Sequence, residues 1–360
     1  VAAWSPTPNV VLEKMASLLF ARATLLTNLV LVLLPLLSAA QFESPTRPSR
    51  FLQLRENIIW RRARKSPWAS LRGGSSSSSP QEQQEGAASR DMYDKQASNW
   101  VRNEPRCLSD FTGRPVVFGQ LAPHIKGATV LDVGCGEGYC ARRVAAMGAA
   151  KVIGIDISEG MIKGAISATA KDDNRFKFFV ASCSEMLSAL EERQDDLEIN
   201  KAQESFDVAM AVFLFNYLTS DETKDAMCKI NEALKPGGIF VFSVPHPNMI
   251  TCHDKSSIFH LDAEGKGYFT SRNEKILGTI STMDGEKLNI MSVHKTLNDY
   301  MCAIKAADFE VLDICEAGVT NEHMEMNPQF FESVQDKPLH LIFKLKKRGN
   351  NYSESQEGPS

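Results

Sequence analysis

Five apolar runs of strand length alternate with helical segments in the middle of this chain, and this alternation constrains its fold more than any other feature. The runs lie at residues 129–133, 151–155, 176–181, 206–212 and 239–244. Residues 139–146 and 159–168 show helical spacing between them. Nearly continuous apolar strands separated by helices are typical of a parallel sheet covered on both faces. We therefore expect an α/β fold whose ligands bind beyond the carboxyl ends of the strands.

Later segments add to this sheet. Residues 309–314 and 339–345 predict two further strands that close it. Residues 268–296 contain short alternating runs around the turn Asp284-Gly285, which predicts a small β-hairpin placed as a cap over the ligand edge. Residues 187–205 are highly charged and predict a solvated helical insertion.

A glycine-rich turn follows the first strand and opens a helix. Its residues are Asp132-Val133-Gly134-Cys135-Gly136-Glu137-Gly138. Glycines let the backbone bend sharply and approach a ligand, and the start of the helix offers unpaired N–H groups. The spacing G-x-G-x-G differs from the G-x-G-x-x-G of dinucleotide-binding folds, so it argues against a nicotinamide oxidoreductase.

Two more motifs stand at fixed places after this turn. Asp156 ends the second strand, where a carboxylate can accept both hydroxyl groups of a ribose. Residues 235–238 (Lys-Pro-Gly-Gly) form a helix-ending turn before the fifth strand. Each motif alone has an ordinary structural explanation, but their order and spacing together are far more specific.

With these motifs, residues 91–347 resemble the Rossmann-like (class I) S-adenosylmethionine-dependent methyltransferases. The resemblance implies a seven-stranded, mostly parallel sheet with helices on both faces, an antiparallel last strand, and S-adenosyl-L-methionine as the cofactor. It also implies that the glycine turn holds the methionine part, that Asp156 binds the ribose, and that Ile157 and Met161 flank the adenine. The cofactor-binding residues expected on this basis are Tyr93, Asp132, Gly134, Cys135, Gly136, Gly138, Asp156, Ile157, Met161, Ser182, Cys183 and Val212.

One position departs from the family pattern. The family often has an Asp-Ala pair after the third strand, and this chain has Ser182-Cys183. The backbone N–H of Cys183 is still available to the adenine. The departure leaves a second function open, that of a cofactor-binding but catalytically inactive assembly or regulatory factor.

Within the family, the chain is most similar to enzymes that methylate small molecules. The similarity is carried by Tyr93-Asp94 with Trp100, by residues 243–247 and by residues 294–300. No Asn-Pro-Pro-Tyr or Asp-Pro-Pro-Tyr tetrapeptide, the mark of many nucleobase and glutamine methyltransferases, follows the fourth strand. We therefore expect methyl transfer to an O, N or C atom of a small-molecule acceptor by in-line displacement, which requires alignment and exclusion of water.

The acceptor site is expected beside the cofactor. His246 and His294 are the candidate catalytic bases, because a neutral histidine accepts a proton near pH 7. The residues expected to bind the substrate are Phe213, Asn216, Tyr217 and Tyr300.

Charge and cysteine content exclude other classes. Residues 91–360 carry 29 Lys and Arg against 39 Asp and Glu, and a domain this acidic is a poor partner for nucleic acid. The eight cysteines include no C-x-x-C pair, so we expect no metal site and free thiols in a reducing compartment, with a disulfide framework as the alternative. A monomer or homodimer without stable membrane insertion of the mature domain is expected.

The first 90 residues have the composition of a targeting presequence. Residues 15–40 combine a weakly basic start, an apolar run and small residues, as a signal peptide does. Residues 41–90 carry nine Lys and Arg against four Asp and Glu and are rich in Ser, as transit peptides are. The pair resembles the bipartite plastid presequences of algae with secondary plastids. A signal anchor, a secretory destination and an untargeted disordered tail remain alternatives, and residues 348–360 are expected to be a disordered tail.

Overall fold

The structure is a computed structural model that describes residues 90–91, 94, 100, 102 and 104–349. The predicted signal peptide at 15–40, Tyr93 and nearly all of the transit-like and C-terminal segments lie outside the described residues. Within the described part of the chain, no helix is both long and apolar enough to cross a membrane.

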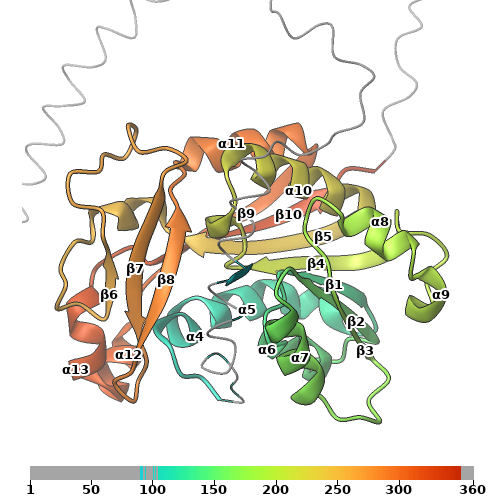
Figure 1. The fold of residues 1–360 in the computed structure, drawn as a ribbon, viewed down its shortest axis with the longest axis horizontal. Coiled ribbons are helices and arrows are strands. Elements are labelled where there is room, and N and C mark those ends of the chain that lie inside the picture. Colours follow the sequence, from blue (N-terminus) through green and yellow to red (C-terminus); the bar gives the residue numbers. More distant parts are fainter. Residues whose placement is uncertain (1–89, 92–93, 95–99, 101, 103, 350–360) are drawn as a thin grey trace, which may run out of the picture. The chain divides into compact units, whose positions relative to one another are not determined.

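Seven strands form the main sheet, in the order β3-β2-β1-β4-β5-β10-β9 (Figure 1). They are β1 (Thr129–Val133), β2 (Lys151–Asp156), β3 (Phe176–Val180), β4 (Phe206–Val212), β5 (Leu234–Pro245), β9 (Phe309–Ala317) and β10 (His340–Lys347). Strands β1 to β5 pair in parallel, and β10 lies antiparallel between β5 and β9. The predicted seven-stranded sheet with an antiparallel last strand is confirmed. Its order reverses between β1 and β4, where sheets of this kind bind ligands.

The fifth strand begins earlier than the sequence indicates. Phe206 on β4 pairs with Leu234, but Val208 pairs with Ile239. The register shift places residues 235–238 in a bulge of β5 instead of a turn before it, and Gly237 takes the left-handed backbone conformation there (φ 78°).

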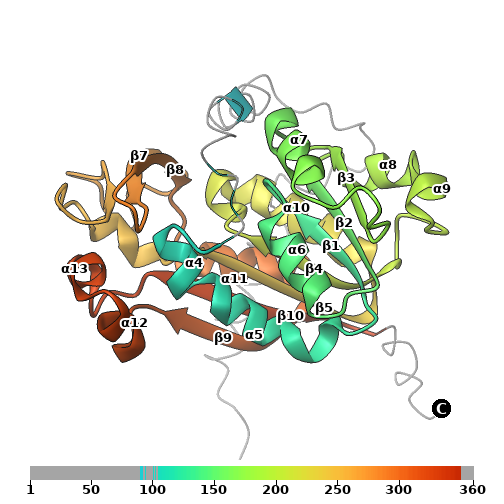
Figure 2. The same cartoon turned by 90° about the horizontal axis from the view of Figure 1, so that it is seen from below.

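Helices cover both faces of the main sheet (Figures 1 and 2). On one face are α5 (Arg114–Ile125), α6 (Tyr139–Ala146) and α7 (Glu159–Ser167). On the other are α8 (Met186–Glu191), α10 (Ser220–Ala233) and α11 (Leu297–Ala306). Side chains alternate along each strand, so Val130 packs on the α5 and α6 side whereas Leu131 and Val133 pack on the α10 and α11 side.

The charged segment at 187–205 is helical in part and exposes most of its charged side chains, as the sequence predicts, but it also packs into the core, which the sequence does not predict. It contains part of α8 and all of α9 (Gln194–Leu197), and Leu190, Leu197 and Ala202 are fully buried in the core. The charged residues occupy the outer side, and the few apolar residues all point inward.

A second, antiparallel sheet carries the predicted hairpin. Its strands are β6 (Phe259–Leu261), β7 (Lys275–Ser281) and β8 (Lys287–Val293). The hairpin of β7 and β8 turns at Asp284-Gly285, where Gly285 has φ 90°. This small sheet shares a separate apolar cluster with α4 (Leu108–Thr112), η3 (Pro247–Thr251) and α13 (Pro328–Phe331). The remaining short helices are α12 (Asn321–Met326), η2 (Phe215–Tyr217) and η4 (Glu332–Val334).

Candidate active site

The glycine-rich turn has a backbone that only glycine adopts easily. Gly134, Gly136 and Gly138 have φ values of 71°, 55° and 80°. The N–H groups of Gly134 and Cys135 both donate to the Ile155 carbonyl, at 2.8 and 2.9 Å. A Cβ on Gly134 would lie 2.7 Å from Leu214, whereas Gly136 faces open space. The turn is therefore held against β2 and leaves room for a ligand at its middle glycine.

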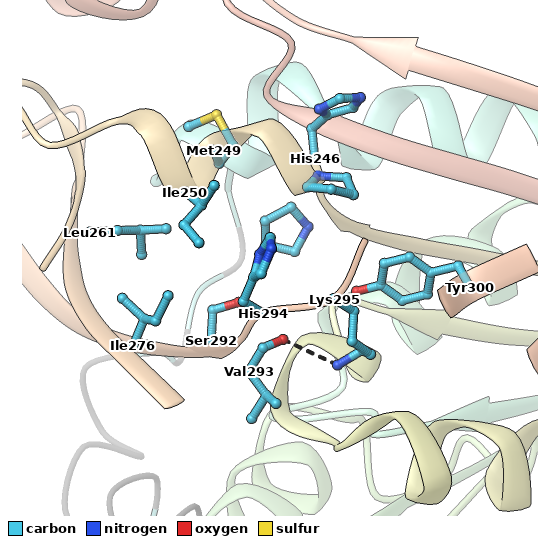
Figure 3. Close-up of a pocket in the computed structure, with 12 residues that line it drawn as sticks. His246, Met249, Ile250, Leu261, Ile276, Ser292, Val293, His294, Lys295 and Tyr300 are labelled. Carbon is cyan, nitrogen blue, oxygen red and sulfur yellow. Dashed lines mark hydrogen bonds between the residues drawn. The ribbon is translucent and has the colours of Figure 1, made fainter. Parts of the chain in front are cut away.

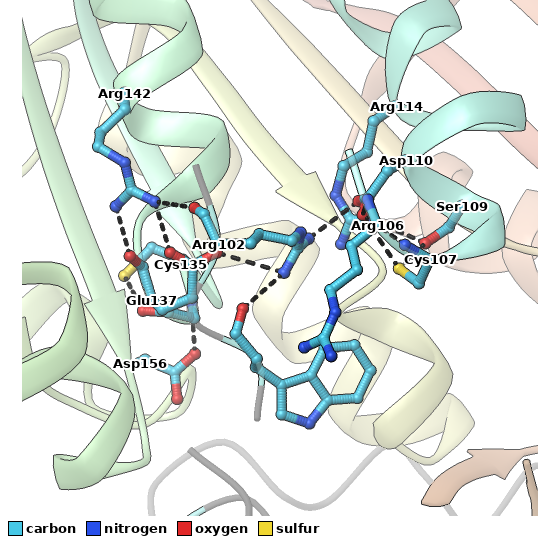
Figure 4. A network of polar contacts seen from close by, with 12 residues as sticks. Arg102, Arg106, Cys107, Ser109, Asp110, Arg114, Cys135, Glu137, Arg142 and Asp156 are labelled. Carbon is cyan, nitrogen blue, oxygen red and sulfur yellow. Dashed lines mark hydrogen bonds and ion pairs between the residues drawn. The ribbon is translucent and has the colours of Figure 1, made fainter. Parts of the chain in front are cut away.

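Asp156 joins the two loops at this edge of the sheet. Its Oδ2 accepts the N–H of Gly136 in the glycine turn (Figure 4), and its Oδ1 accepts the N–H of Ser158, each at 2.9 Å. Burial raises the pKa of the carboxyl group, and the two N–H donors oppose that rise. Each oxygen keeps a second lone pair for a ligand hydroxyl.

Asp132 is a buried carboxyl group with an unused oxygen. The residue is 1% exposed, and its Oδ2 has no hydrogen-bond partner in the described structure. Burial, with the charge of Asp156 next, raises the pKa of Asp132 to about 8. A buried polar atom left without a partner is expected where a ligand supplies one.

A pocket lies between the end of β5 and the small sheet (Figure 3). Its volume is about 20 Å³, enough for a water molecule. It is lined by Pro245, His246, Pro247, Met249, Ile250, Leu261, Ile276, Ser292, Val293, His294, Lys295 and Tyr300. Both predicted catalytic histidines and the predicted substrate residue Tyr300 thus meet at one cavity, although they are far apart in the sequence.

The two histidines differ in the nitrogen atoms that they leave free. His246 accepts the N–H of Asn248 on Nδ1, at 3.1 Å, and its Nε2 lies 2.8 Å from Glu316 Oε1. Both of its ring nitrogens are thus in use. His294 donates from Nε2 to the carbonyl of Tyr268 at 2.8 Å, and burial lowers its pKa. His294 is therefore a neutral ring whose Nδ1 is the proton-accepting nitrogen.

Most of the other predicted cofactor residues lie around the loops after β1 to β4. Met161 is buried on the first turn of α7, and its N–H donates to Ser158 Oγ at 3.1 Å. Ser182 is tied to its neighbours through Glu185, and Cys183 is half-buried beside the core. Val212 ends β4.

Three of the four predicted substrate residues do not line the pocket. Phe213, in a left-handed conformation (φ 59°), packs edge-on against His340. Asn216 is buried on η2 and its Oδ1 has no partner among the described residues. Tyr217 shares η2 with it.

Sequence reasoning missed a buried network of charges beside the glycine turn (Figure 4). Arg102 pairs with Asp110 at 3.0 Å and with Glu137 of the glycine turn at 3.3 Å. Asp110 also binds Arg114, and Glu137 also binds Arg142. Glu137 stands within the glycine motif. Its partner Arg142 is five residues away, but Arg102, which links it to Asp110, is 35 residues away, so no local pattern indicates the network.

Comparison with known proteins identifies the fold's family. Residues 130–238, which contain the glycine turn and Asp156, match the methyltransferase domain family. The chain carries a domain of the S-adenosylmethionine-dependent methyltransferases. The expected family and fold are thereby confirmed, and the cofactor of this methyltransferase domain is S-adenosylmethionine.

The known proteins that are similar to this chain align with only part of it. An uncharacterised protein of Haemophilus influenzae is 31% identical over 42% of this chain and 55% of its own length, so the chain spans about half of that relative. N-demethylindolmycin N-methyltransferase of Streptomyces griseus is 25% identical over 64% of this chain and 89% of that enzyme. A crystal structure of an S-adenosylmethionine-dependent methyltransferase from Mesorhizobium loti is 21% identical, covering 64% of this chain and 96% of that one, with a TM-score of 0.48.

The residues of the methyltransferase domain fit this cofactor. Gly136 leaves the open space that a backbone-bound ligand requires. Asp156 has lone pairs for the ribose hydroxyls, and the unpaired Oδ2 of Asp132 can accept from an ammonium group. Arg114, whose charge lowers the pKa of Asp132, is paired with Asp110, so no ion pair occupies Asp132 within the described residues.

Proposed function

We propose that the protein is an enzyme that moves a methyl group from S-adenosylmethionine to an O, N or C atom of a small-molecule acceptor. The observation that carries the proposal is the position of the two sites. The glycine turn and Asp156 follow the carboxyl ends of β1 and β2, and the pocket follows the carboxyl end of β5. Because β1, β2, β4 and β5 are parallel neighbours, all these ends lie on one edge of the sheet.

The chain's own contribution is binding and alignment. S-adenosylmethionine supplies an activated methyl group on a sulfonium. Asp156 and the glycine turn hold the cofactor in a fixed orientation. The buried apolar residues Leu261 and Ile276 of the small sheet form part of the pocket wall, which an acceptor would share in place of water. Fixing two reactants in line, away from water, accounts for much of the rate in reactions of this type.

His294 is the favoured proton acceptor for a hydroxyl or protonated amine. Its ring is neutral because it is buried, and the bond from Nε2 to the Tyr268 carbonyl directs the free lone pair to Nδ1. His246 would first have to release Asn248 or Glu316. An acceptor that is already anionic needs no base.

A small-molecule acceptor is supported by two observations. The domain is acidic, and the Streptomyces griseus relative is named for methylation of a small molecule. An acidic surface repels nucleic acid.

Calorimetric titration with S-adenosylmethionine, S-adenosylhomocysteine and NAD tests the cofactor. We expect the first two to bind with micromolar dissociation constants and NAD not to bind. Asp156→Ala should weaken binding by at least about tenfold, because the ribose contact and the anchor of Gly136 are lost together. The matched control is Asp172→Ala, because the side chain of Asp172 is an exposed carboxylate outside the predicted cofactor site.

Failure of both adenosyl ligands to bind the unmodified protein would contradict the proposal. Binding without methyl transfer to any acceptor in a screen of small molecules would favour an inactive assembly or regulatory factor instead.

A further inference from the structure

Lys295 is a buried lysine whose hydrogen bonds go to backbone carbonyls. The residue is 2% exposed, on the link between β8 and α11. Its Nζ donates to the carbonyls of Leu218 and Val293 and lies 5.7 Å from the centre of the Tyr300 ring. Within the described part of the chain, no Asp or Glu forms an ion pair with it.

The nearest acidic groups already have other partners. Glu222, on α10, accepts from the N–H and hydroxyl of Thr219 at 2.7 and 2.8 Å. Asp299, on α11, accepts from Arg272 and from Thr296. His294 and Tyr300, the other titratable neighbours, are neutral, because burial lowers the pKa of His294 and raises that of Tyr300. Glu222 and Asp299 raise the pKa of Lys295 through their charges, but neither forms an ion pair with its Nζ.

Burial without a contacting carboxylate destabilises the charged form of Lys295, and a bound anion would stabilise it. An isolated buried charge is strongly unfavourable unless a group of opposite charge accompanies it. Burial accordingly lowers the pKa of Lys295 to about 7. A bound anion would restore the full positive charge.

One side of the pocket wall is apolar. Met249, Ile250, Leu261 and Ile276 are nearly fully buried there. The polar lining residues are His246, Ser292, His294, Lys295 and Tyr300, and the twelve lining residues include no Asp or Glu (Figure 3). The pocket thus combines apolar side chains with one lysine and no acidic side chain.

We propose that this pocket selects acceptors with an apolar body and an anionic oxygen group, and that Lys295 binds that group. The inference rests on the proposed function, since it names the class of acceptor for the same site. The cavity holds about 20 Å³, so the acceptor enters by displacing side chains of the small sheet, and its anionic group takes the place of the Leu218 and Val293 carbonyls as the partner of Nζ.

Two matched series of probes test the proposal on the full chain. One is octanoate, octan-1-ol and octylamine, and the other is 4-ethylbenzoate, 4-ethylbenzyl alcohol and 4-ethylbenzylamine. Binding is measured by ligand-observed NMR and calorimetry below any micelle concentration. We expect at least one carboxylate to bind about tenfold or more tightly than its alcohol and amine, a difference of about 1.4 kcal/mol. Its affinity should fall from pH 6 to pH 8.5 as Lys295 loses its proton.

Variants then test whether Lys295 causes the preference for the carboxylate. Lys295→Met should abolish the preference for the carboxylate, and Lys295→Arg should keep part of it because the charge remains. Lys287→Met, an exposed lysine on β8, is the matched control and should change nothing.

The outcomes separate this inference from the proposed function. If neither carboxylate binds better than its alcohol and amine, or if Lys295→Met keeps the preference, the inference is wrong. If Lys295→Met fails to fold, the probe series on the unmodified protein still tests the preference for carboxylates. S-adenosylhomocysteine binding, measured in the same samples, reports separately on the cofactor site and should persist in Lys295→Met.

Discussion

At the scale of single residues, the site contains two carboxyl groups whose ionised forms are destabilised by burial. Asp132 is the last residue but one of β1, Asp156 is the last residue of the neighbouring parallel strand β2, and burial raises the pKa of both. Of the two, Asp156 alone accepts backbone N–H groups from the described residues, which compensates for the lost water. Asp132 is thus a place where the chain gives up stability for a binding group.

The raised pKa of Asp132 predicts that the free energy of unfolding depends on pH. The unfolded chain releases the Asp132 proton near pH 4, whereas the folded protein holds it until about pH 8. Stability must therefore fall as the pH rises through this window, by at most about 1.4 kcal/mol per pH unit. We expect Asp132→Asn to increase the free energy of unfolding of the ligand-free protein, more at pH 8 than at pH 5, and to weaken S-adenosylmethionine binding.

Urea unfolding at the two pH values measures this effect. Asp172→Asn, at an exposed position, is the control and should leave the free energy of unfolding unchanged at both pH values. An equal effect of Asp132→Asn at both pH values would show that burial does not raise the pKa of Asp132.

At the scale of elements, the buried charge network joins the segment before α4 to the glycine turn. Arg102 is the bridge, since it binds both Asp110 and Glu137, and its side chain is 8% exposed. Asp94 makes a second connection by accepting from Ser158 Oγ and the N–H of Gly160, at 2.5 and 3.1 Å. Residues that precede the main sheet thus contact the loops after both β1 and β2.

Removing Arg102 should disturb the cofactor site from a distance. Arg102→Met leaves two buried carboxylates short of a partner, and we expect a loss of about 3 kcal/mol in the free energy of unfolding with weaker S-adenosylhomocysteine binding. Arg106→Met is the comparison, because Arg106 pairs with the exposed Asp284 and Glu286; we expect a loss below about 1 kcal/mol. Thermal unfolding and calorimetry measure both effects, and equal losses would contradict a special role for Arg102.

The sequence predicts the elements of the sheet better than the contacts of the site. The bounds of β1, β4 and α6 are those expected, because each is an apolar run or amphipathic segment bounded by local turn signals. The bulge in β5 and the burial of Lys295 depend on neighbours from other strands and helices. No local pattern encodes them, so only the structure reveals them.

At the scale of the whole molecule, the presequence prediction stays untested because it falls outside the described residues. We expect residues 1–90 fused to a fluorescent protein to enter the plastid of an alga with a secondary plastid, since residues 15–40 and 41–90 have the compositions of a signal and a transit peptide. Deleting residues 41–90 from the fusion should leave it in the secretory pathway. Cytosolic fluorescence of the full fusion would contradict the prediction.

The place of β10 in the main sheet also has a consequence for biosynthesis. β10 spans His340–Lys347 and fills the gap between β5 and β9. Because a chain is synthesised from its amino end, the half of the sheet that holds the glycine turn emerges long before β10 does. Until then β5 has an open edge, and Phe242 lacks the ring of Phe343 that stacks on it at 4.7 Å. Nascent chains of this protein therefore carry an apolar strand with an unpaired edge, which favours aggregation until β10 has been synthesised.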